Sequence, residues 1–561
     1  MLRFSVFLMA TLAAAQTVHV PLTACKAAGG RAEALCGKYE VFENRATKSG
    51  RQIKLNLMVL RAVDAKPEPD PVFLLAGGPG QAAVQTFQGL ALQYRQKRDV
   101  VLVDQRGAGE SNPLRCDLDE GVAAAFARLL PLDKLARCRD QLEKTADLRQ
   151  YTTSVAMDDL DEVRAALGYE RINVWGGSYG TTAGLEYLRR HGDHVRTLTL
   201  VAVIPPAYRV PLPFAHTVQK SMEALFARCA ADAPCRGALP HLRAEFETVL
   251  DRLGKAPVTF RFTSPPAIQE PIEIKLSRDM FGDYLRRIPY TMQGISLMPL
   301  AIHSAYGGDF ETFARLCYEL SIRTQDDTPF GMYFSILCNE SFPFISAEET
   351  ARVSKGTYVG DFRVREQGAM CRDWPNAHVP KSFVEPVRSD RPVLLFSGEF
   401  DPAGQPEYAA EEAKYFPHSK HVISRNASHG LGGPCAMGIT MRFIDSGTAD
   451  GLDTSWIDEM RLPPFRLKGP RQAGMSPQLL AEFAGSYEPS PGSAYTVRAD
   501  SGLLMLKAPS APSEVALYPM SQNRLFMMVA DGEVEFVRDE SGVVSYLVVH
   551  TAGRAIRMMR K

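Results

Sequence analysis

The fold class is decided by the stretch Ile172-Asn173-Val174-Trp175-Gly176-Gly177-Ser178-Tyr179-Gly180. In it a short apolar strand runs straight into a Gly-x-Ser-x-Gly turn, and the residues after Gly180 have the pattern of a helix. A turn between a buried strand and a helix forces the serine onto a strained elbow with an exposed hydroxyl. We expect glycine to be required at positions 176 and 180, because a side chain there would collide with the neighbouring strand or helix.

Apolar runs on both sides of this stretch extend an alternation of strands and helices. The expected strands are Ile53–Leu60, Val72–Ala76, Val100–Asp104, Thr197–Val203, Pro392–Phe396 and His421–Ser424. The expected helices are Met157–Leu167, residues 180–190, Glu407–Phe416 and a segment after Pro434. This alternation predicts the α/β class, with a doubly wound and mostly parallel sheet.

A long insertion interrupts the alternation after Ile204. The inserted stretch is largely helical and carries cysteines, and a loop of that length without structure is improbable inside a compact domain. We therefore predict residues 205–390 as a helical lid over the carboxyl edge of the sheet. The α/β core is then formed by residues 16–204 and 391–465.

A different pattern begins beyond a proline-rich linker that contains Pro463 and Pro470. Short alternating runs, separated by turn residues, are typical of antiparallel strands. The runs are Tyr495–Arg498, Leu503–Lys507, Leu525–Val529 and Val544–Val549. They predict a small antiparallel β domain over residues 471–561, in which we find no convincing catalytic grouping.

The first residues have the pattern of a cleavable signal peptide over residues 1–15. Arg3 supplies a positive charge, Phe4–Ala14 is apolar, and Ala13-Ala14-Ala15 has the small residues of a cleavage site. The apolar run is well below the roughly 18 residues that span a membrane, which disfavours an uncleaved anchor. We expect a secreted or periplasmic protein with no membrane span after signal removal.

The charges balance, with 64 basic and 64 acidic residues. Binding to nucleic acid or to an anionic membrane needs clustered Lys and Arg, so this balance argues against both. Small, neutral or zwitterionic substrates fit better. The chain has no cluster of His and Cys at metal-ligand spacing, so we expect no metal and no cofactor. The sequence does not indicate an oligomeric state.

Ser178 is the predicted nucleophile. A serine hydroxyl needs a base to take its proton and an acid to orient that base, and after such an elbow the partners follow in the order acid, then histidine. His429 is the predicted base, because it lies in a small polar loop after the last expected core strand. His418 and His421 flank that strand and are more typical of surface or packing residues.

Asp401 is the predicted acid, since it follows the strand Pro392–Phe396 and the Asp-Pro turn fixes its direction. Glu399 is the alternative. The developing oxyanion needs preorganised N–H donors. We expect one from Tyr179, directly after the nucleophile, and the other from Gly78 or, as an alternative, Gly77.

These motifs, taken in order, resemble the proline iminopeptidase and tripeptidyl aminopeptidase group of α/β-hydrolases. The resemblance rests on Gly77-Gly78-Pro79-Gly80, Asp104-Gln105-Arg106-Gly107-Ala108-Gly109-Glu110-Ser111, Gly176–Gly180, Asp401-Pro402 and His429. It covers residues 35 to 446. Three departures bear on the substrate: Ala76 replaces a common His, Val201-Ala202-Val203 replaces Asp-Gly-Val, and Ala403-Gly404 replaces Val-Thr.

The resemblance implies cleavage of one to three residues from a free N-terminus, with acidic lid residues that hold the substrate's ammonium group. Glu340 is the first candidate for that role and Asp373 the second, with an ordinary solvated carboxylate as the alternative for each. Asp104 and Arg106 are expected to brace the loop below the oxyanion hole and not to touch substrate.

Ten cysteines in an exported chain predict disulfides, although the sequence does not fix their connectivity. Proximity along the chain proposes the pairs Cys25–Cys36, Cys116–Cys138, Cys229–Cys235 and Cys317–Cys338. Cys371 and Cys435 remain, and a bridge between them would join the lid to the loop region behind His429.

Three functions are therefore open. The first is an aminopeptidase that acts through an acyl-enzyme on peptide substrates. The second is a carboxylesterase that uses the same triad on small ester or other acyl substrates. The third is a catalytically silent binding protein, against which the complete triad argues.

Overall fold

The computed structural model describes residues 20–118, 120–264, 268–322, 329–430, 434–467, 475–490, 492–509, 514–528, 532–551 and 554–561. The predicted signal peptide, residues 1–15, lies outside these ranges. Within them, no helix combines the length and the apolar character that a membrane crossing requires.

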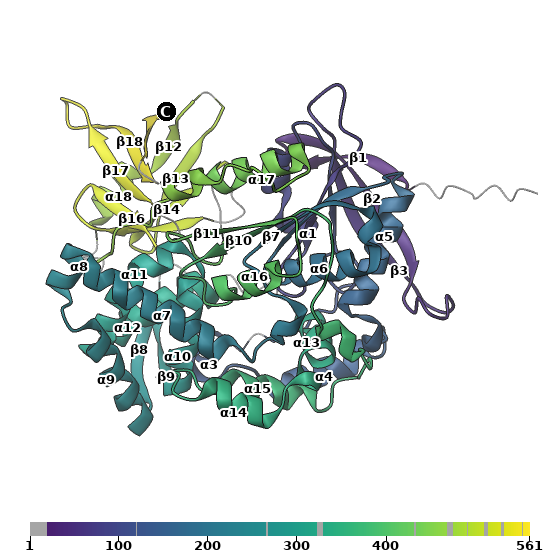
Figure 1. Ribbon diagram of the computed structural model, residues 1–561. Helices are drawn as coiled ribbons and strands as arrows, with labels where there is room; N and C mark the ends of the chain where they lie inside the picture. The colour runs from purple at the N-terminus through teal and green to yellow at the C-terminus, as the bar shows by residue number, and fades with distance from the viewer. Residues whose placement is uncertain are drawn as a thin grey trace, which may run out of the picture.

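A nine-stranded sheet runs from the middle of the molecule to its right-hand side in Figure 1, in the order β1-β2-β3-β5-β4-β6-β7-β10-β11. The pairs from β1 to β5 are antiparallel, and the pairs from β5 through β11 are parallel. The strands are β1 (Leu22–Ala27), β2 (Ala32–Phe42), β3 (Gln52–Leu60), β4 (Val72–Leu75), β5 (Val100–Val103), β6 (Ile172–Gly177), β7 (Val195–Val201), β10 (Val393–Gly398) and β11 (Ser419–Ser424). The predicted α/β fold with a mostly parallel sheet is confirmed.

Helices cover both faces of this sheet, because successive side chains of each strand point to opposite faces. In β4, Phe73 packs in a cluster with α5 and α6, whereas Leu74 packs in a second cluster with α2 and α17. The core helices are α1 (Ala83–Thr86), α2 (Gln88–Tyr94), α5 (Thr153–Ala166), α6 (Tyr179–His191), α16 (Pro406–Ala413) and α17 (Pro434–Ser446). Between β5 and α5 lie α3 (Val122–Ala127), α4 (Leu132–Leu142) and η1 (Leu148–Gln150).

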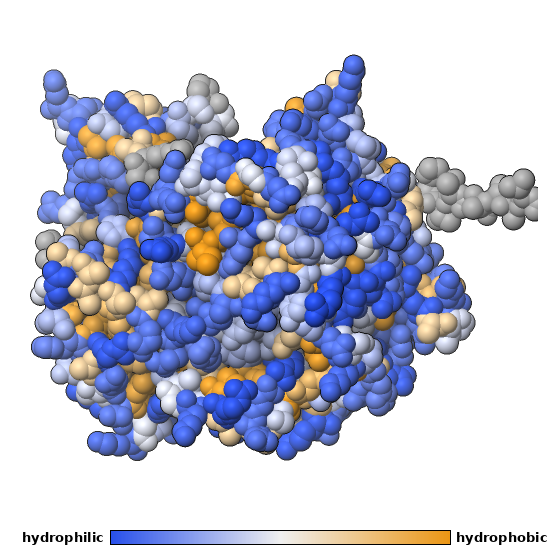
Figure 2. All heavy atoms as spheres, in the orientation of Figure 1, coloured by the Kyte–Doolittle hydropathy of each residue, from blue (hydrophilic) through white to orange (hydrophobic). Residues whose placement is uncertain are grey.

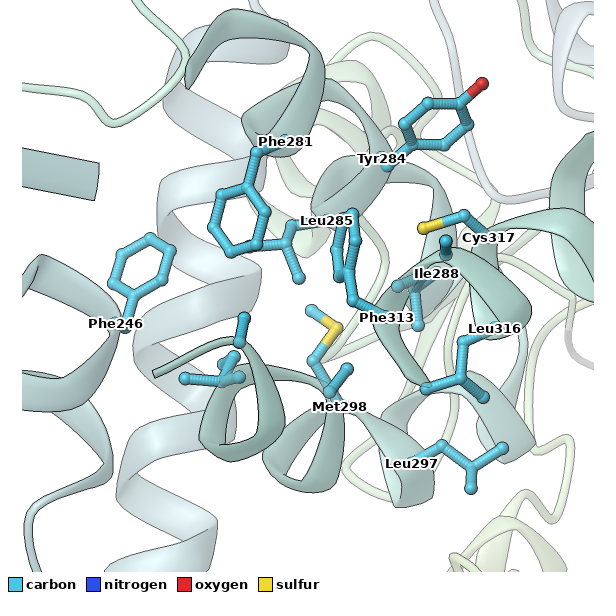
Figure 3. Close-up of a cluster of buried hydrophobic side chains, with 14 of the residues drawn as sticks. Phe246, Phe281, Tyr284, Leu285, Ile288, Leu297, Met298, Phe313, Leu316 and Cys317 are labelled. Carbon is cyan, nitrogen blue, oxygen red and sulfur yellow. The ribbon is translucent and has the colours of Figure 1, made fainter. Parts of the chain in front are cut away.

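The predicted helical lid lies between β7 and β10, and it also contains a hairpin of β8 (Val258–Ser264) and β9 (Ile268–Leu276) that we did not predict. Its long helices are α7 (Phe214–Ala231), α9 (Leu242–Lys255), α10 (Arg278–Arg287), α11 (Met292–Tyr306), α13 (Phe330–Glu340) and α15 (Phe362–Cys371). Shorter elements are η3 (Pro206–Tyr208), α8 (Ala233–Ala238), η4 (Ile288–Tyr290), α12 (Phe310–Cys317), η5 (Tyr318–Ile322), η6 (Phe342–Phe344), α14 (Ala347–Ser354) and η7 (Lys381–Val384). Figure 3 shows how aromatic and aliphatic side chains of α9 to α12 interlock in the core of the lid.

The C-terminal β domain is a closed antiparallel barrel, in which β12 (Gly485–Glu488) pairs with β19 (Arg554–Arg560). Between them run β13 (Tyr495–Asp500), β14 (Leu503–Lys507), β15 (Val515–Pro519), β16 (Arg524–Met527), β17 (Glu533–Arg538) and β18 (Val544–Thr551). The helix α18 (Pro477–Phe483) and the turn η8 (Ser455–Glu459) precede the barrel. Tyr518 and Phe526 belong to the buried cluster of the lid, so the barrel and the lid share one apolar core.

The molecular surface is mostly hydrophilic on the face seen in Figure 2, where hydrophobic residues form small separated groups. This agrees with a chain that buries its apolar side chains in the clusters of the sheet, the lid and the barrel.

Four disulfides are present, and three of them are the predicted pairs Cys25–Cys36, Cys116–Cys138 and Cys229–Cys235. The fourth joins Cys338 to Cys371, so the predicted pairs Cys317–Cys338 and Cys371–Cys435 are wrong. The reason is tertiary packing: α13 and α15 bring the two Cα atoms within 4.9 Å. Cys317 is instead buried in the apolar cluster of Figure 3, and neither it nor Cys435 is paired.

Candidate active site

Ser178 lies on the elbow between β6 and α6 with φ of 56° and ψ of −126°. This conformation is rare for a residue with a side chain and stores strain at the turn. A Cβ atom at Gly176 would overlap the carbonyl oxygen of Gly180, and one at Gly180 would overlap that of Leu75. The predicted need for glycine at both positions is therefore confirmed.

Asp401 and His429 meet at the carboxyl ends of β10 and β11. The imidazole Nδ1 lies 2.9 and 3.0 Å from the two carboxylate oxygens of Asp401. Asp401 is fully buried, and its Oδ1 also accepts hydrogen bonds from the amides of Ala403 and Gly404, at 2.7 and 2.9 Å. These amides hold the carboxylate in one orientation toward His429. The alternative acid, Glu399, is exposed.

Ser178 and His429 line the same cavity, whose volume is about 300 Å³. The structure therefore brings the predicted nucleophile and base to one site, although they are 251 positions apart in the sequence. The other two histidines considered above lie elsewhere: His418 is exposed, and His421 is 3.0 Å from the hydroxyl of Ser397. Burial lowers the pKa of His421 to about 4.

The two predicted oxyanion donors belong to segments that border this cavity. Tyr179 opens α6 directly after Ser178, and Gly78 lines the cavity with φ of +111°, which favours glycine. A Cβ atom on Gly77 would come within 3.2 Å of the Cβ of Ser178. The glycine-rich loop thus packs closely against the nucleophile, as a second donor segment requires.

Two of the departures from the family pattern are packed against each other. A Cβ atom at Gly404 would lie 2.7 Å from the backbone carbon of Ala202, and Ala202 itself has φ of 55°. The loop that follows Asp401 therefore fits against the end of β7 only with glycine at position 404. This tight fit supports the orientation of the acid.

Asp104 braces the start of α1, which follows the predicted oxyanion loop, whereas the hydrogen bonds of Arg106 go to α5 and to the carbonyls of Glu43 and Gln150. Asp104 accepts hydrogen bonds from the amide of Val84 at 2.9 Å and from the side chain of Asn56 at 2.8 Å. Arg106 is fully buried and pairs with Asp159 at 2.6 Å. Neither residue lines the cavity of Ser178.

Glu340, at the end of α13, lines the cavity of Ser178 and is almost fully buried. Its carboxylate accepts hydrogen bonds from the amide and the hydroxyl of Thr153, and that hydroxyl lies 2.7 Å from the hydroxyl of Tyr179. Burial, helped by the charge of Glu186, raises the pKa of Glu340 to about 8. Over the described ranges, no Lys, Arg or His forms an ion pair with this carboxylate.

Asp373 lies outside that site. Its side chain is exposed and borders a different cavity, together with Glu43, Arg51 and His378. The structure therefore places the first of the two acidic candidates next to the predicted nucleophile and the second away from it.

The lid contributes cavity residues that sequence reasoning missed. Tyr290 packs against the imidazole of His429, with ring centroids 4.6 Å apart, and Phe214 and Arg209 border the same space. Arg209 and Pro205 also border a second cavity of about 580 Å³. No short motif marks these lid residues, because their places depend on how the lid folds over the sheet.

Among the described residues, one group of side chains of metal-binding type lies on α5, at the end of α6 and on the turn after it, away from the cavity. Ligand atoms of Asp161, His191 and His194 lie within 4.8 Å of one another. However, Asp161 is bound to Arg164 at 2.7 Å and accepts a hydrogen bond from Tyr187 at 2.9 Å. We interpret the group as an ion-pair network that joins α5 to the end of α6.

Comparison with known proteins adds to this geometry. A family model described as alpha/beta hydrolase fold matches residues 70–431. The serine protease Hip1 of Mycobacterium tuberculosis is 29% identical over 275 residues, which cover 44% of this chain and 52% of that protein. The tripeptidyl aminopeptidase of Streptomyces coelicolor is 31% identical over 191 residues, which cover 31% of this chain and 35% of that protein.

The matched part of the chain thus spans about half the length of the first relative and about a third of the second. Among solved structures, a proline iminopeptidase of Mycobacterium smegmatis aligns with a TM-score of 0.35 at 17% identity. That alignment covers 73% of this chain and 98% of the other.

Proposed function

This chain belongs to the α/β-hydrolase fold family, and from that premise we propose that it is a secreted or periplasmic serine aminopeptidase. Its substrates are peptides with a free N-terminus, from which it releases one to three residues. The names of its relatives, a serine protease and a tripeptidyl aminopeptidase, support a peptidase. The four disulfides are consistent with an exported protein.

The proposed reaction proceeds through an acyl-enzyme. The hydroxyl of Ser178 attacks the scissile carbonyl while His429 accepts the proton, and Asp401 orients the imidazole and stabilises its charged form. The amides of Tyr179 and Gly78 donate hydrogen bonds to the oxyanion. The tetrahedral intermediate then breaks the C–N bond, and His429 gives its proton to the departing amine. Water, activated by the same base, hydrolyses the ester to Ser178.

The carboxyl group of Glu340, buried in the cavity of Ser178 and without an ion-pair partner in the described ranges, is the observation that carries the choice of a peptide substrate. A buried carboxylate without a cationic partner is costly, and an ammonium group supplies the missing charge. The N-terminus of a peptide would bind there and so fix its distance from Ser178. The second cavity, which shares Pro205 and Arg209 with the first, gives room for the part of the peptide beyond the scissile bond.

The test compares peptide p-nitroanilides that have a free or an acetylated N-terminus. Acetylation removes the positive charge, so kcat/KM should fall by about 10- to 100-fold, which corresponds to the roughly 1.5–3 kcal/mol of a hydrogen bond to a charged group. Glu340→Gln should cause a similar loss on the free peptide and little on the acetylated one. Asp373→Asn, a change of an exposed carboxylate outside the cavity, is the matched control and should have no effect.

A carboxylesterase is the second candidate, because much of the cavity wall is apolar. The apolar lining residues include Ile204, Val210, Phe214, Ile336 and Leu337. Such a pocket suits the acyl chain of a small ester. Hydrolysis of p-nitrophenyl esters together with no release from any free peptide would overturn the aminopeptidase and favour this alternative.

A further inference from the structure

A turn of the lid touches the loop of His429 at two points. The hydroxyl of Ser428 donates a hydrogen bond to the carbonyl of Pro289. The ring of Tyr290 packs on the imidazole of His429 at 4.6 Å, with 58° between the planes. Pro289 and Tyr290 both belong to η4. His429, the predicted general base, is therefore in direct contact with the lid although it belongs to the core.

The turn η4 is itself firmly held by buried charged groups. Nη1 of Arg286 donates to the hydroxyl of Tyr290 at 3.1 Å, and the guanidinium lies over the ring of Phe214 at 5.0 Å. Arg286 is buried and is bound to Asp283 at 3.2 Å. Asp283 also binds Arg363 of α15 at 2.6 Å. These contacts fix the hydroxyl of Tyr290 from the side of the lid.

The barrel contacts the first turn of α11, which directly follows η4. Gln293, three residues after Tyr290, donates to the carbonyl of Met527 in β16 at 3.4 Å. Thr291 caps α11 through the amide of Gly294 at 3.0 Å, and a Cβ atom at position 294 would overlap the carbonyl of Ile288. The backbone from Ile288 to Thr291 thus lies between α10 and a first turn of α11 that contacts the barrel.

A general base works only when its ring nitrogen is held within reach of the nucleophile's proton. The bond from Nδ1 to Asp401 fixes one edge of the imidazole but does not prevent the ring from tilting about that bond. A ring packed against the imidazole face restricts this motion. Misplacement of a catalytic group by about 1 Å can reduce the rate by about 100-fold.

We propose that Tyr290, with Pro289, is a positioning residue that holds the imidazole of His429 in its reactive orientation, so that the lid and barrel form part of the catalytic scaffold. The proposal rests on the assignment of His429 as the base. It does not depend on whether the substrate is a peptide or an ester. The aromatic ring of Tyr290 carries the effect, and its hydroxyl anchors the ring to Arg286.

The test uses the full-length chain with Tyr290→Leu, which removes the ring, and Tyr290→Phe, which keeps it. On a small p-nitrophenyl ester, Tyr290→Leu should lower kcat by about 10- to 100-fold, with KM changed less than about threefold. Tyr290→Phe, which keeps the ring, should have a kcat within about threefold of the wild-type value. A residue that only binds substrate would change KM, so the split between kcat and KM separates the two roles.

Ser428→Ala provides a second and milder variant, since it removes the hydrogen bond to Pro289, together with a longer one of 3.4 Å to the carbonyl of Phe400, and should lower kcat severalfold. Circular dichroism and thermal unfolding show whether each variant is folded. A folded Tyr290→Leu protein with unchanged kcat, or with a change confined to KM, would overturn the proposal. If Tyr290→Leu does not fold, an unchanged kcat in Ser428→Ala would overturn it instead. If the wild type hydrolyses the ester but cleaves no free peptide, the proposed aminopeptidase activity is overturned and the proposed role of Tyr290 is not.

Discussion

Glu340 is buried and has no ion-pair partner among the described residues, and this makes its protonation part of the stability of the fold. Its pKa is about 8 in the folded chain, against an ordinary value of 4.5. Between these two values the folded state binds a proton that the unfolded state has released. The contribution of Glu340 to the free energy of unfolding is therefore fully present below about pH 4.5 and is lost as pH rises through 8.

We therefore expect the wild type to lose stability relative to Glu340→Gln as pH increases from 5 to 9, because the glutamine stays neutral. The measurement is urea unfolding of both proteins at several pH values. A buried carboxyl with this shift should change the difference by more than about 1.4 kcal/mol, the equivalent of one pKa unit. If the difference in the free energy of unfolding between the two proteins stays constant with pH, Glu340 is ionised throughout this range. The predicted pH-dependent contribution of Glu340 to stability would then be wrong.

The catalytic triad could be predicted from the sequence, but the sequence could not distinguish Glu340 from Asp373. Ser178, Asp401 and His429 follow strands that end at one edge of a parallel sheet, so their order along the chain was enough to predict that they meet. Glu340 and Asp373 were both suggested by resemblance, and only the fold of the lid distinguishes them. Tyr290 had no motif at all, because its role comes from contact with His429.

At the scale of elements, α13 is the part of the lid that carries Glu340, and the disulfide from Cys338 to Cys371 ties it to α15. The alternation of strands and helices in the core was predictable because hydrophobic periodicity reports local structure. The pairing of α13 with α15 was not, since it depends on packing between segments 33 residues apart. Proximity along the chain therefore gave Cys338 the wrong partner, and Cys371 was then left with Cys435 as the remaining cysteine.

Removal of this disulfide should affect both stability and substrate binding. We expect Cys338→Ala/Cys371→Ala to lower the free energy of unfolding by about 3–4 kcal/mol, as for a closed loop of this length. Because Glu340 lies two residues after Cys338, KM for a free peptide should also rise severalfold. Both quantities can be measured by denaturant unfolding and steady-state kinetics.

The control for that variant is Cys25→Ala/Cys36→Ala, which removes the bridge between β1 and β2 at the edge of the sheet. It should lower stability without changing KM. If Cys338→Ala/Cys371→Ala lowers the stability but leaves KM unchanged, the disulfide between α13 and α15 does not position Glu340.

At the scale of the whole molecule, the barrel, the lid and the core form a continuous structure. Tyr518 of the barrel lies 3.2 Å from Glu319 of the lid, and the lid in turn contacts His429 through Tyr290. An antiparallel β domain was predictable from its alternating runs. Its closure was not, because β12 must pair with β19 at the far end of the domain. The barrel shares an apolar core with the lid, so it can support the lid even though we find no catalytic grouping within it.

The central claim is that this scaffold makes Ser178 a nucleophile, and reaction with a fluorophosphonate probe tests it most directly. The probe should form one phosphonyl ester per chain with loss of fluoride, and peptide mapping should place it on Ser178. Ser178→Ala should abolish the label. Ser486→Ala, which alters the second Gly-Ser-Tyr sequence of the chain, should leave it unchanged. No label on the folded wild type, or an equal label on Ser178→Ala, would contradict the account.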